Sequence, residues 1–412
     1  MIFLVMTIGM GVFSASAART INVNLEDQLY YQNGAGIRLE QYWPSNISPK
    51  PIGPYDYGEP VEEEEEEEIV YREPSFEPIT ELKQVETTAK VFEREELKVE
   101  AGKRSINYAQ LMAIETKDFG ETAWFKSSLV PGNYHWYHYL NLIAEEPRAV
   151  LVSEQVAKAL SVEKGDIITL SWPGSNSDEF IIYDTIKYWP TFNPLAKIDE
   201  EEEQIGALVV ANLPYIQANL GLEPYEVWLN LKPDSVREDF YEDIEASDIQ
   251  VTQMDDVLPQ VTKLKNSALL LGVNGAMTMG FFISLFISFI GFLLYWILTI
   301  KSRTLQYGIY RAMGISMVDI TGIMIWEQIF TSGIACVFGI LIGGLTSYLY
   351  VPLFKISLGI DQLMPPFVVI SDVSDEVKIY IFVAGILVLG SAILIGFIRK
   401  IKIDQAIKLG ED

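Results

Sequence analysis

Apolar residues are concentrated in a few long segments of the chain. The longest of them, Asn266 to Ile300, has 35 residues without a charged side chain. Gln328 to Phe354 and Ile379 to Ile398 are further uncharged runs of 27 and 20 residues. A helix rises about 1.5 Å per residue and a bilayer core is about 30 Å thick, so about 20 residues suffice to cross it. The pattern therefore predicts three membrane-spanning helices.

The first 18 residues, Met1 to Ala18, are also uncharged and allow two interpretations. One is a cleaved signal peptide, because Ala15-Ser16-Ala17 resembles a small-residue cleavage site, although no basic residue precedes the apolar run. The other, which we favour, is a retained spanning helix that ends at Arg19. At roughly 27 Å such a helix just crosses a thin bilayer. With it, the chain has four predicted transmembrane helices.

Between Arg19 and Lys265 the pattern changes to short strand-like runs separated by helical ones, which is typical of an α+β domain. In the clearest unit, a strand is followed by Ser153 as an N-cap, a short helix, and Gly165 as the turn into the next strand. The predicted strands are Ala149 to Val152, Asp166 to Trp172, Phe180 to Tyr183, Ala207 to Ala211, Tyr225 to Leu231 and Ile249 to Met254, and the predicted helices are Glu154 to Leu160 and Asp234 to Ala246.

Charge divides the chain at the same place. Residues 1–265 hold 47 acidic and 21 basic residues, and residues 266–412 hold 9 of each, so the whole net charge of −26 lies on the first part. A field of this sign repels phosphate and excludes a nucleic-acid binder that works through a basic surface. The single cysteine, Cys336, excludes a disulfide-stapled scaffold.

Basic residues in the short loops predict the orientation. Lys301, Arg303 and Arg311 follow the second helix, and Arg399, Lys400, Lys402 and Lys408 follow the fourth, which makes both segments cytoplasmic. The loop from Lys355 to Lys378 is acidic and is expected outside. The α+β domain, inserted between helices 1 and 2, is then extracytoplasmic. The predicted segments are helix 1 (1–18), the external domain (19–265), helix 2 with its stalk (266–300), a cytoplasmic loop (301–319), helix 3 (320–354), an external loop (355–378), helix 4 (379–398) and a cytoplasmic tail (399–412).

Two acidic runs interrupt the external domain. Glu62 to Glu68 is seven consecutive glutamates inside a Pro-rich stretch, and like charges of this density stay solvated, so residues 44–78 are expected to form a mobile insertion. Asp199 to Glu203 is a shorter run. Neither run alternates its acids around a glycine as a Ca²⁺ loop does.

Residues that could carry catalysis are scarce. The two histidines, His135 and His138, have an i, i+3 spacing but no acid near them in sequence, and the aromatic residues around them favour a packed or partner-facing loop over a metal site. The chain has no GxxxxGK[ST] phosphate loop, so we expect no ATP hydrolysis, no metal and no cofactor on this chain. Glu327, at the head of the third helix, is either an interfacial residue or a buried functional acid.

Small residues recur every four positions on the second and third helices, which is typical of helices that pack closely in lipid. The residues expected at these contacts are Gly272, Ala276, Gly280 and Ser284 on the second helix and Ala335, Gly339 and Gly343 on the third.

Three segments resemble the FtsX-like/MacB-type permeases of ABC transporters. Lys301 to Ser316, KSRTLQYGIYRAMGIS, is similar to the family's cytoplasmic element R…EIG(I)LRA(L/M)GAS. The tail Ile401 to Glu411 resembles the family's closing sequence, and Pro147 to Leu170 resembles its SE…A…L…GD segment. Gln306 and Tyr307 replace the usual Glu-Ile pair. The first helix lacks the basic lead-in of the family and resembles helices inside longer permeases, so both a complete subunit and one half of a permease remain open.

The resemblance implies a permease subunit that works with a separate ATPase, on which ATP is bound. The apolar face of Leu305, Ile309, Ala312 and Met313 recurs with helical spacing, and such a short face can lie on lipid or dock into a groove of a partner. With the family resemblance we favour docking, and expect an ATPase-coupling loop made of Leu305, Gly308, Ile309, Arg311, Ala312, Met313 and Gly314.

The partners expected from the resemblance are an ABC ATPase, a second copy or a second permease unit, and outside the membrane a peptide, lipoprotein or wall-associated protein. Export and mechanotransmission across a bacterial-type cell membrane both fit. The alternative is a membrane-anchored receptor or adhesion module without an ATPase. The sequence does not distinguish among cargoes.

Overall fold

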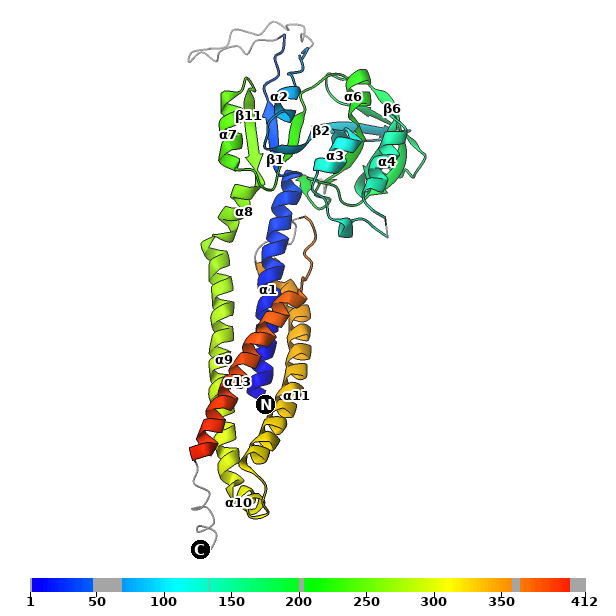
Figure 1. Cartoon of the computed structure of the whole chain (residues 1–412). Coiled ribbons are helices and arrows are strands. Elements are labelled where there is room, and N and C mark those ends of the chain that lie inside the picture. The colour runs from blue at the N-terminus through cyan, green and yellow to red at the C-terminus, as the bar shows by residue number, and fades with distance from the viewer. Residues whose placement is uncertain (1, 47–68, 133, 200–203, 358–363, 401–412) are drawn as a thin grey trace, which may run out of the picture. The chain divides into compact units, whose positions relative to one another are not determined.

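The computed structural model describes residues 2–46, 69–132, 134–199, 204–357 and 364–400 (Figure 1), and it divides into two compact units. One unit holds Met1–Leu25, Lys263–Asp361 and Phe367–Asp412, and the other holds Glu26–Thr262 with Gln362–Pro366. The first is helical and the second is built on a β-sheet. The glutamate run at 62–68, most of the acidic run that starts at Asp199, and the tail motif after Lys400 lie outside the described residues.

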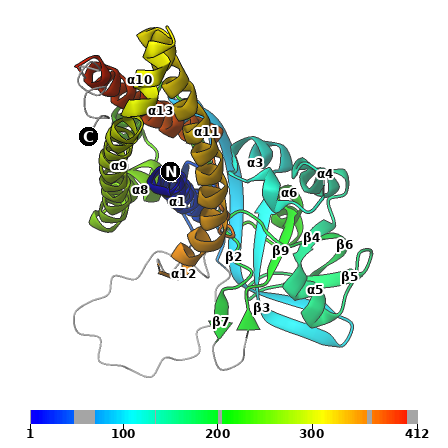
Figure 2. The same cartoon turned by 90° about the horizontal axis from the view of Figure 1, so that it is seen from below.

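In the helical unit, the described residues contain four helices that are long and apolar enough to cross a membrane. They are α1 (Ile2–Asn33), α9 (Ala268–Ser302), α11 (Met317–Tyr350) and α13 (Val373–Lys400), and the short helix α10 (Thr304–Ala312) joins α9 to α11. In the view along the bundle, α1 is flanked by α9, α11 and α13 (Figure 2). Ile8 and Val12 of α1 pack there with Leu285 of α9 and Val383 of α13.

The first helix is longer than the sequence predicts. We expected it to end at Arg19, but α1 continues to Asn33. Arg19 does not stop the helix because its guanidinium pairs with Asp372 at 3.0 Å and with Asp375 at 2.6 Å. The small residues that resemble a cleavage site lie inside this helix, and Ser16 and Ala17 are buried. The retained helix stays a prediction.

Polar residues of α1 continue this contact beyond Arg19. Asn24 donates from Nδ2 to the carbonyl of Val368 (2.8 Å) and accepts the amide of the same residue at Oδ1 (2.9 Å). Thr20 exchanges the same pair of hydrogen bonds with Ile370. The extended segment before α13 is therefore paired to α1 through side chains that satisfy its backbone. Helices α11 and α13 also begin earlier than predicted, at Met317 and Val373 instead of 320 and 379.

In the second unit, the described strands form one nine-stranded sheet in the order β11-β1-β10-β2-β3-β9-β4-β6-β5. Strand β5 also pairs with β2, so the last six strands close into a ring. The strands are β1 (Ile37–Gln41), β2 (Val85–Ala101), β3 (Arg104–Ile114), β4 (Ala149–Ser153), β5 (Ile167–Ser171), β6 (Asp178–Ile186), β9 (Leu208–Asn212), β10 (Glu226–Leu231) and β11 (Val251–Asp256), with β7 (Lys197–Asp199) and β8 (Gln204–Ile205) as a separate ribbon.

A bulge in β2 makes this closure possible. The register with β3 shifts between Arg94 and Leu97, and Glu96 has a positive φ of 59°. A bulge bends its strand and increases the local twist. The first half of β2 therefore pairs with β10, while Lys98 to Glu100 pair with β5.

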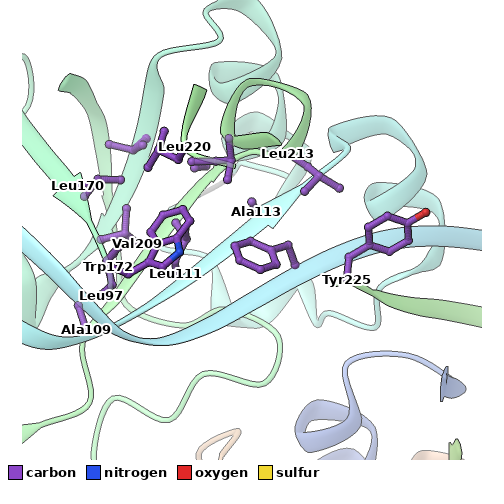
Figure 3. Packing of buried hydrophobic residues seen from close by; sticks show 14 of the residues in the cluster. Leu97, Ala109, Leu111, Ala113, Leu170, Trp172, Val209, Leu213, Leu220 and Tyr225 are labelled. Carbon is purple, nitrogen blue, oxygen red and sulfur yellow. The ribbon is translucent and has the colours of Figure 1, made fainter. Parts of the chain in front are cut away.

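Both faces of the sheet are buried. Side chains from β2, β3, β5 and β9 pack with helices on one face (Figure 3). That face is covered by α2 (Glu77–Thr80), α5 (Glu154–Leu160), α6 (Leu213–Asn219) and α7 (Arg237–Ala246). On the other face, Phe119 of α3 (Thr116–Thr122) packs on Trp189 and Trp228, in a cluster that α4 (Tyr137–Glu145) also joins. Successive residues of β4 face opposite clusters, which explains its unbroken apolar sequence.

Candidate functional site

The candidate site is α10 and the helix ends that hold it. The α10 sequence begins directly after Arg303, which ends α9, and the chain turns at Gly314 before α11 starts. Gly314 has a φ of +91°, its amide donates to Arg311 O (3.0 Å), and the next amide, of Ile315, donates to Tyr310 O (3.1 Å). This pair of bonds is a Schellman ending, which needs a left-handed residue and so favours glycine. The residues around Gly314 therefore determine the change of chain direction after α10.

The start of α11 is fixed just as locally. Ser316 accepts the amide of Asp319 at its hydroxyl, and the Asp319 carboxylate accepts the amide of Ser316, both at 3.2 Å. This capping box satisfies two amides that the first turn leaves open. Only Ile315 separates the glycine turn from this cap, so the hairpin between α10 and α11 has little freedom.

The inner side of α10 packs on the long helices. Tyr307 lies against a cluster formed by Trp296 and Ile300 of α9 and Met324 of α11. Gly308, the next residue, is buried. This side of the helix is structural and holds α10 at the end of the bundle.

An ion pair ties the beginning of α10 to α11. Arg303 Nη1 lies 2.9 Å from Glu327 Oε2, and both side chains are partly exposed. Glu327 is therefore not a deeply buried acid, and its charge is balanced by the arginine that ends α9. This pair was not predicted, because 24 positions separate the two residues in sequence.

The outer side of α10 is an apolar row open to the surroundings. Leu305, Ile309 and Met313, at i, i+4 and i+8, keep 61%, 52% and 64% of their surface accessible. Arg311 and Ala312 are also exposed. Of the seven residues expected in the coupling loop, the structure therefore places five on the accessible surface, Gly308 in the packed interface and Gly314 in the turn. We call Leu305, Ile309 and Met313 the α10 row.

The predicted packing residues divide into two groups. Gly339 and Gly343 of α11 contact α1: a Cβ on Gly343 would lie 2.8 Å from Val12 Cβ and 2.9 Å from Gly9 O. Ala335 is buried in the same helix. Gly280 lies against Met10, and Ser284 against Thr7 with 3.1 Å between the hydroxyls. Gly272 and Ala276, in contrast, are exposed, and nothing lies within 4 Å of a Cβ placed on Gly272.

The described residues hold no group of three or more metal-ligating side chains. His135 and His138 are both exposed, and each stacks on or meets the edge of a tyrosine: His138 on Tyr134 at 5.2 Å and His135 against Tyr137 at 4.4 Å. Trp136 between them is buried. One ring of this loop packs and four face outward, so the packed part of the prediction holds for Trp136, and the partner-facing part stays a prediction.

Comparison with known proteins bears on the helical part. Residues 278–404 match the family model described as FtsX-like permease C-terminal. This range covers most of α9 and all of α10, α11 and α13. It is an FtsX-like permease C-terminal domain, and the resemblance drawn from the sequence motifs is confirmed. Over these residues the chain is similar to the FtsX-like permeases, and the described residues hold four helices that are long and apolar enough to cross a membrane.

Two solved structures are similar to the chain. The periplasmic region of MacB from Actinobacillus actinomycetemcomitans has 9% identity and a TM-score of 0.31, over 47% of this chain and 81% of that one. A domain of a putative permease protein from Porphyromonas gingivalis has 15% identity and a TM-score of 0.28, over 41% and 72%. No curated protein matches the chain.

Proposed function

We propose that this chain is the transmembrane subunit of an ABC transporter of the FtsX/MacB type, driven by a separate ATPase that docks on α10. The α10 row is the observation that supports this most directly. Three large apolar side chains stand on one side of a nine-residue helix whose other side is packed. An amphipathic helix presented in this way suits a groove in a partner protein.

The contacts around α10 suit it to carry force. Arg303 and Tyr307 join it to α9 and α11, so a partner that displaces α10 also displaces the ends of both long helices. Helix α11 packs on α1 through Gly339 and Gly343. Because α1 is one helix from Ile2 to Asn33, a shift of α1 reaches residues that belong to the sheet unit. This is conformational work, and in this proposal ATP is bound and hydrolysed only on the partner.

In this proposal the sheet unit lies outside the cytoplasm and the α10 side lies inside. Basic Lys301, Arg303 and Arg311 support the inner assignment of the loop. The exposed small residues Gly272 and Ala276 leave a surface of α9 that suits close approach of a second copy or of another permease unit. Export of a peptide or lipoprotein and mechanical signalling to a wall-associated protein both remain compatible.

The test replaces the α10 row by charge. Leu305→Asp combined with Ile309→Asp should abolish co-purification of ATP-hydrolysing activity with the tagged chain from its native membranes. Both side chains are exposed, so the fold should tolerate the change. The matched control is Gln306→Asp combined with Ser302→Asp, two exposed positions that add the same two negative charges outside the row. The purified chain alone should hydrolyse no ATP.

Retention of the ATPase by the double variant would refute docking on α10. The rival class, a receptor or adhesion module without an ATPase, predicts that the wild-type chain brings down no ATP hydrolysis at all. The two outcomes differ in the wild-type measurement, so the experiment separates a wrong docking site from a wrong class of protein.

A further inference from the structure

The helical unit contains a cavity between its four long helices. The cavity has a volume of about 360 Å³, and α1, α9, α11 and α13, which are seen end-on in Figure 2, all contribute to its lining. Most of the lining is apolar, with rings such as Phe289 and Phe292, and none of the described residues that form it is charged. Sites for small molecules are typically concave and mostly apolar, with volumes of about 300–1,000 Å³ and a few polar groups.

Two polar side chains interrupt this apolar lining. Gln328 of α11 keeps 8% of its surface accessible, and Ser288 of α9 keeps 6%. Both lie inside helices that are apolar enough to cross a membrane. Polar groups in such a place are costly unless they are hydrogen-bonded, so they often mark a functional site.

Gln328 uses only one end of its carboxamide within the bundle. Its Nε2 donates to Ser391 Oγ at 2.7 Å, and Ser391 in turn donates to Leu387 O at 2.7 Å. Because the only hydroxyl proton of Ser391 is used on that carbonyl, Gln328 must present its nitrogen there. Gln328 Oε1 is then left without a hydrogen-bond partner among the described residues, and so is the Ser288 hydroxyl. The bond to Ser391 joins α11 to α13, but it does not explain an unused acceptor in the wall of a cavity.

Size and polarity limit what can fill this cavity. An apolar cavity of about 150 Å³ holds one benzene molecule and stays free of water, so 360 Å³ holds roughly 14 non-hydrogen atoms. A charged headgroup would lie in the cavity without an opposite charge. A hydrocarbon tail alone would leave Gln328 Oε1 without a hydrogen bond. The remaining candidate is a short apolar chain that carries an uncharged hydrogen-bond donor.

We propose that the cavity binds a neutral, single-chain amphiphile from the membrane, whose hydroxyl group donates to Gln328 Oε1 and whose chain lies among the rings of Phe289 and Phe292. Ser288 supplies a second hydrogen-bonding group in the same lining. Because all four long helices line the cavity, the bound molecule contacts each of them and stabilises their packing. The proposal requires the helical unit to lie in a bilayer, as in the proposed function, and it requires no ATPase.

The experiment uses the full chain in nanodiscs of phosphatidylcholine, with no ATPase present. The probe is dodecanol with a photoreactive diazirine on its chain. We expect saturable photolabelling, which mass spectrometry should locate on lining residues such as Phe289 and Phe292. Unlabelled dodecanol should compete for this labelling. Its methyl ether cannot donate a hydrogen bond to Gln328 Oε1, so it should compete up to about tenfold more weakly.

Two variants test the polar group and the cavity separately. Gln328→Leu keeps an apolar side chain of similar size but removes Oε1, so the alcohol and its ether should compete equally. Ser332→Phe adds a ring to the lining and should abolish saturable labelling. Gly333→Phe is the matched control and should label as the wild type does, because Gly333 is exposed and nothing lies within 4 Å of a Cβ placed on it.

Photolabelling that does not saturate, or that lies on exposed residues such as Phe286 and Phe330, would overturn the proposal. Equal competition by the alcohol and the ether in the wild type would also overturn it, because it would show that the cavity accepts any hydrocarbon chain. Unchanged labelling of Ser332→Phe would contradict the assigned cavity. None of these results depends on the docking of an ATPase on α10.

Discussion

At the scale of single residues, the most unusual group of the sheet unit is Glu93. It lies on β2, where Arg38 donates to its carboxylate at 3.1 Å and Thr191 Oγ1 donates at 3.2 Å. Arg38 also pairs with Glu226, so one guanidinium serves two acids. Burial raises the pKa of Glu93 to about 7, Arg38 opposes this rise, and the charge of Glu226 adds to it. Thr191 holds a φ of +64°, which is costly for a β-branched residue.

This pKa has a defined effect on stability. The folded-state value lies above the unfolded value of 4.5, so the folded chain holds a proton that the unfolded chain releases between about pH 4.5 and 7. The stabilisation from this group is complete below pH 4.5 and is lost as the pH rises through 7. We expect Glu93→Gln to remove this contribution to the pH dependence of the free energy of unfolding. The contribution is on the order of 2 kcal/mol.

The measurement is thermal unfolding of the detergent-solubilised chain at several pH values from 4.5 to 8, for wild type and Glu93→Gln. As the pH rises through this range, the unfolding temperature of Glu93→Gln should increase relative to that of the wild type. Glu95→Gln on the same strand is the control, since Glu95 is exposed. A constant difference between wild type and variant would contradict the assigned pKa.

A second prediction at this scale concerns the ion pair of Arg303 and Glu327. Because both side chains are partly exposed, the pair should contribute only about 0.2–1 kcal/mol. Arg303→Glu and Glu327→Arg alone should each speed hydrogen exchange of the α10 amides by up to about fivefold. The double variant, which restores the pair in reverse, should return the exchange toward wild type. No recovery in the double variant would mean that the pair does not hold α10.

At the scale of elements, the contact of α1 with α11 depends on two glycines that face Ile8 and Val12. Gly343→Ala would place a methyl group 2.9 Å from the carbonyl oxygen of Gly9. Because this oxygen belongs to the backbone, the clash can be relieved only if one of the two helices shifts. Overpacking of this kind costs about 1–3 kcal/mol. The neighbouring Gly344 has nothing within 4 Å of its Cβ position, so Gly344→Ala should be neutral. Thermal unfolding in detergent compares the two, and equal stability of both variants would contradict this packing.

Most elements of the clearest predicted unit are confirmed, and the reason is local. The helix Glu154–Leu160 has the predicted bounds, Ser153 caps it, and Gly165 takes a φ of +96° at the following turn. The long hairpin of β2 and β3 was not predicted. Its strands are interrupted by charged residues such as Arg94, whose partner Glu223 lies far away in sequence, so no period-2 pattern shows.

The local features of the candidate site could also be predicted from the sequence, and its contacts between distant segments could not. The α10 row follows from helical spacing within nine residues, and the glycine turn from its position at the helix end. The packed side of α10 could not be predicted from the sequence, because Tyr307 is covered only by residues of α9 and α11. The bond of Arg303 to Glu327 likewise needs the two helices to be side by side. Contacts between distant segments carry no signal in a single sequence.

At the scale of the whole molecule, the distribution of charge makes a prediction about topology. With Cys336 replaced by alanine, Lys164→Cys in the sheet unit and Gln306→Cys on α10 provide single exposed thiols. A membrane-impermeant maleimide should label position 164 in intact cells and position 306 only in inverted vesicles. Labelling of both positions from the same side would contradict the proposed orientation of the chain.

The ring closed by the pairing of β5 with β2 has one more consequence. Unpaired strand edges recruit strands of other molecules and so promote aggregation. Within the described part of the large sheet, β11 is the strand that pairs on one side alone, and it carries the partly exposed acid Asp255 near its end. Acidic residues on such an edge repel an identical edge. Crowded copies of this unit on one membrane should therefore stay separate, because the bulge at Glu96 leaves a single strand edge and charge protects it.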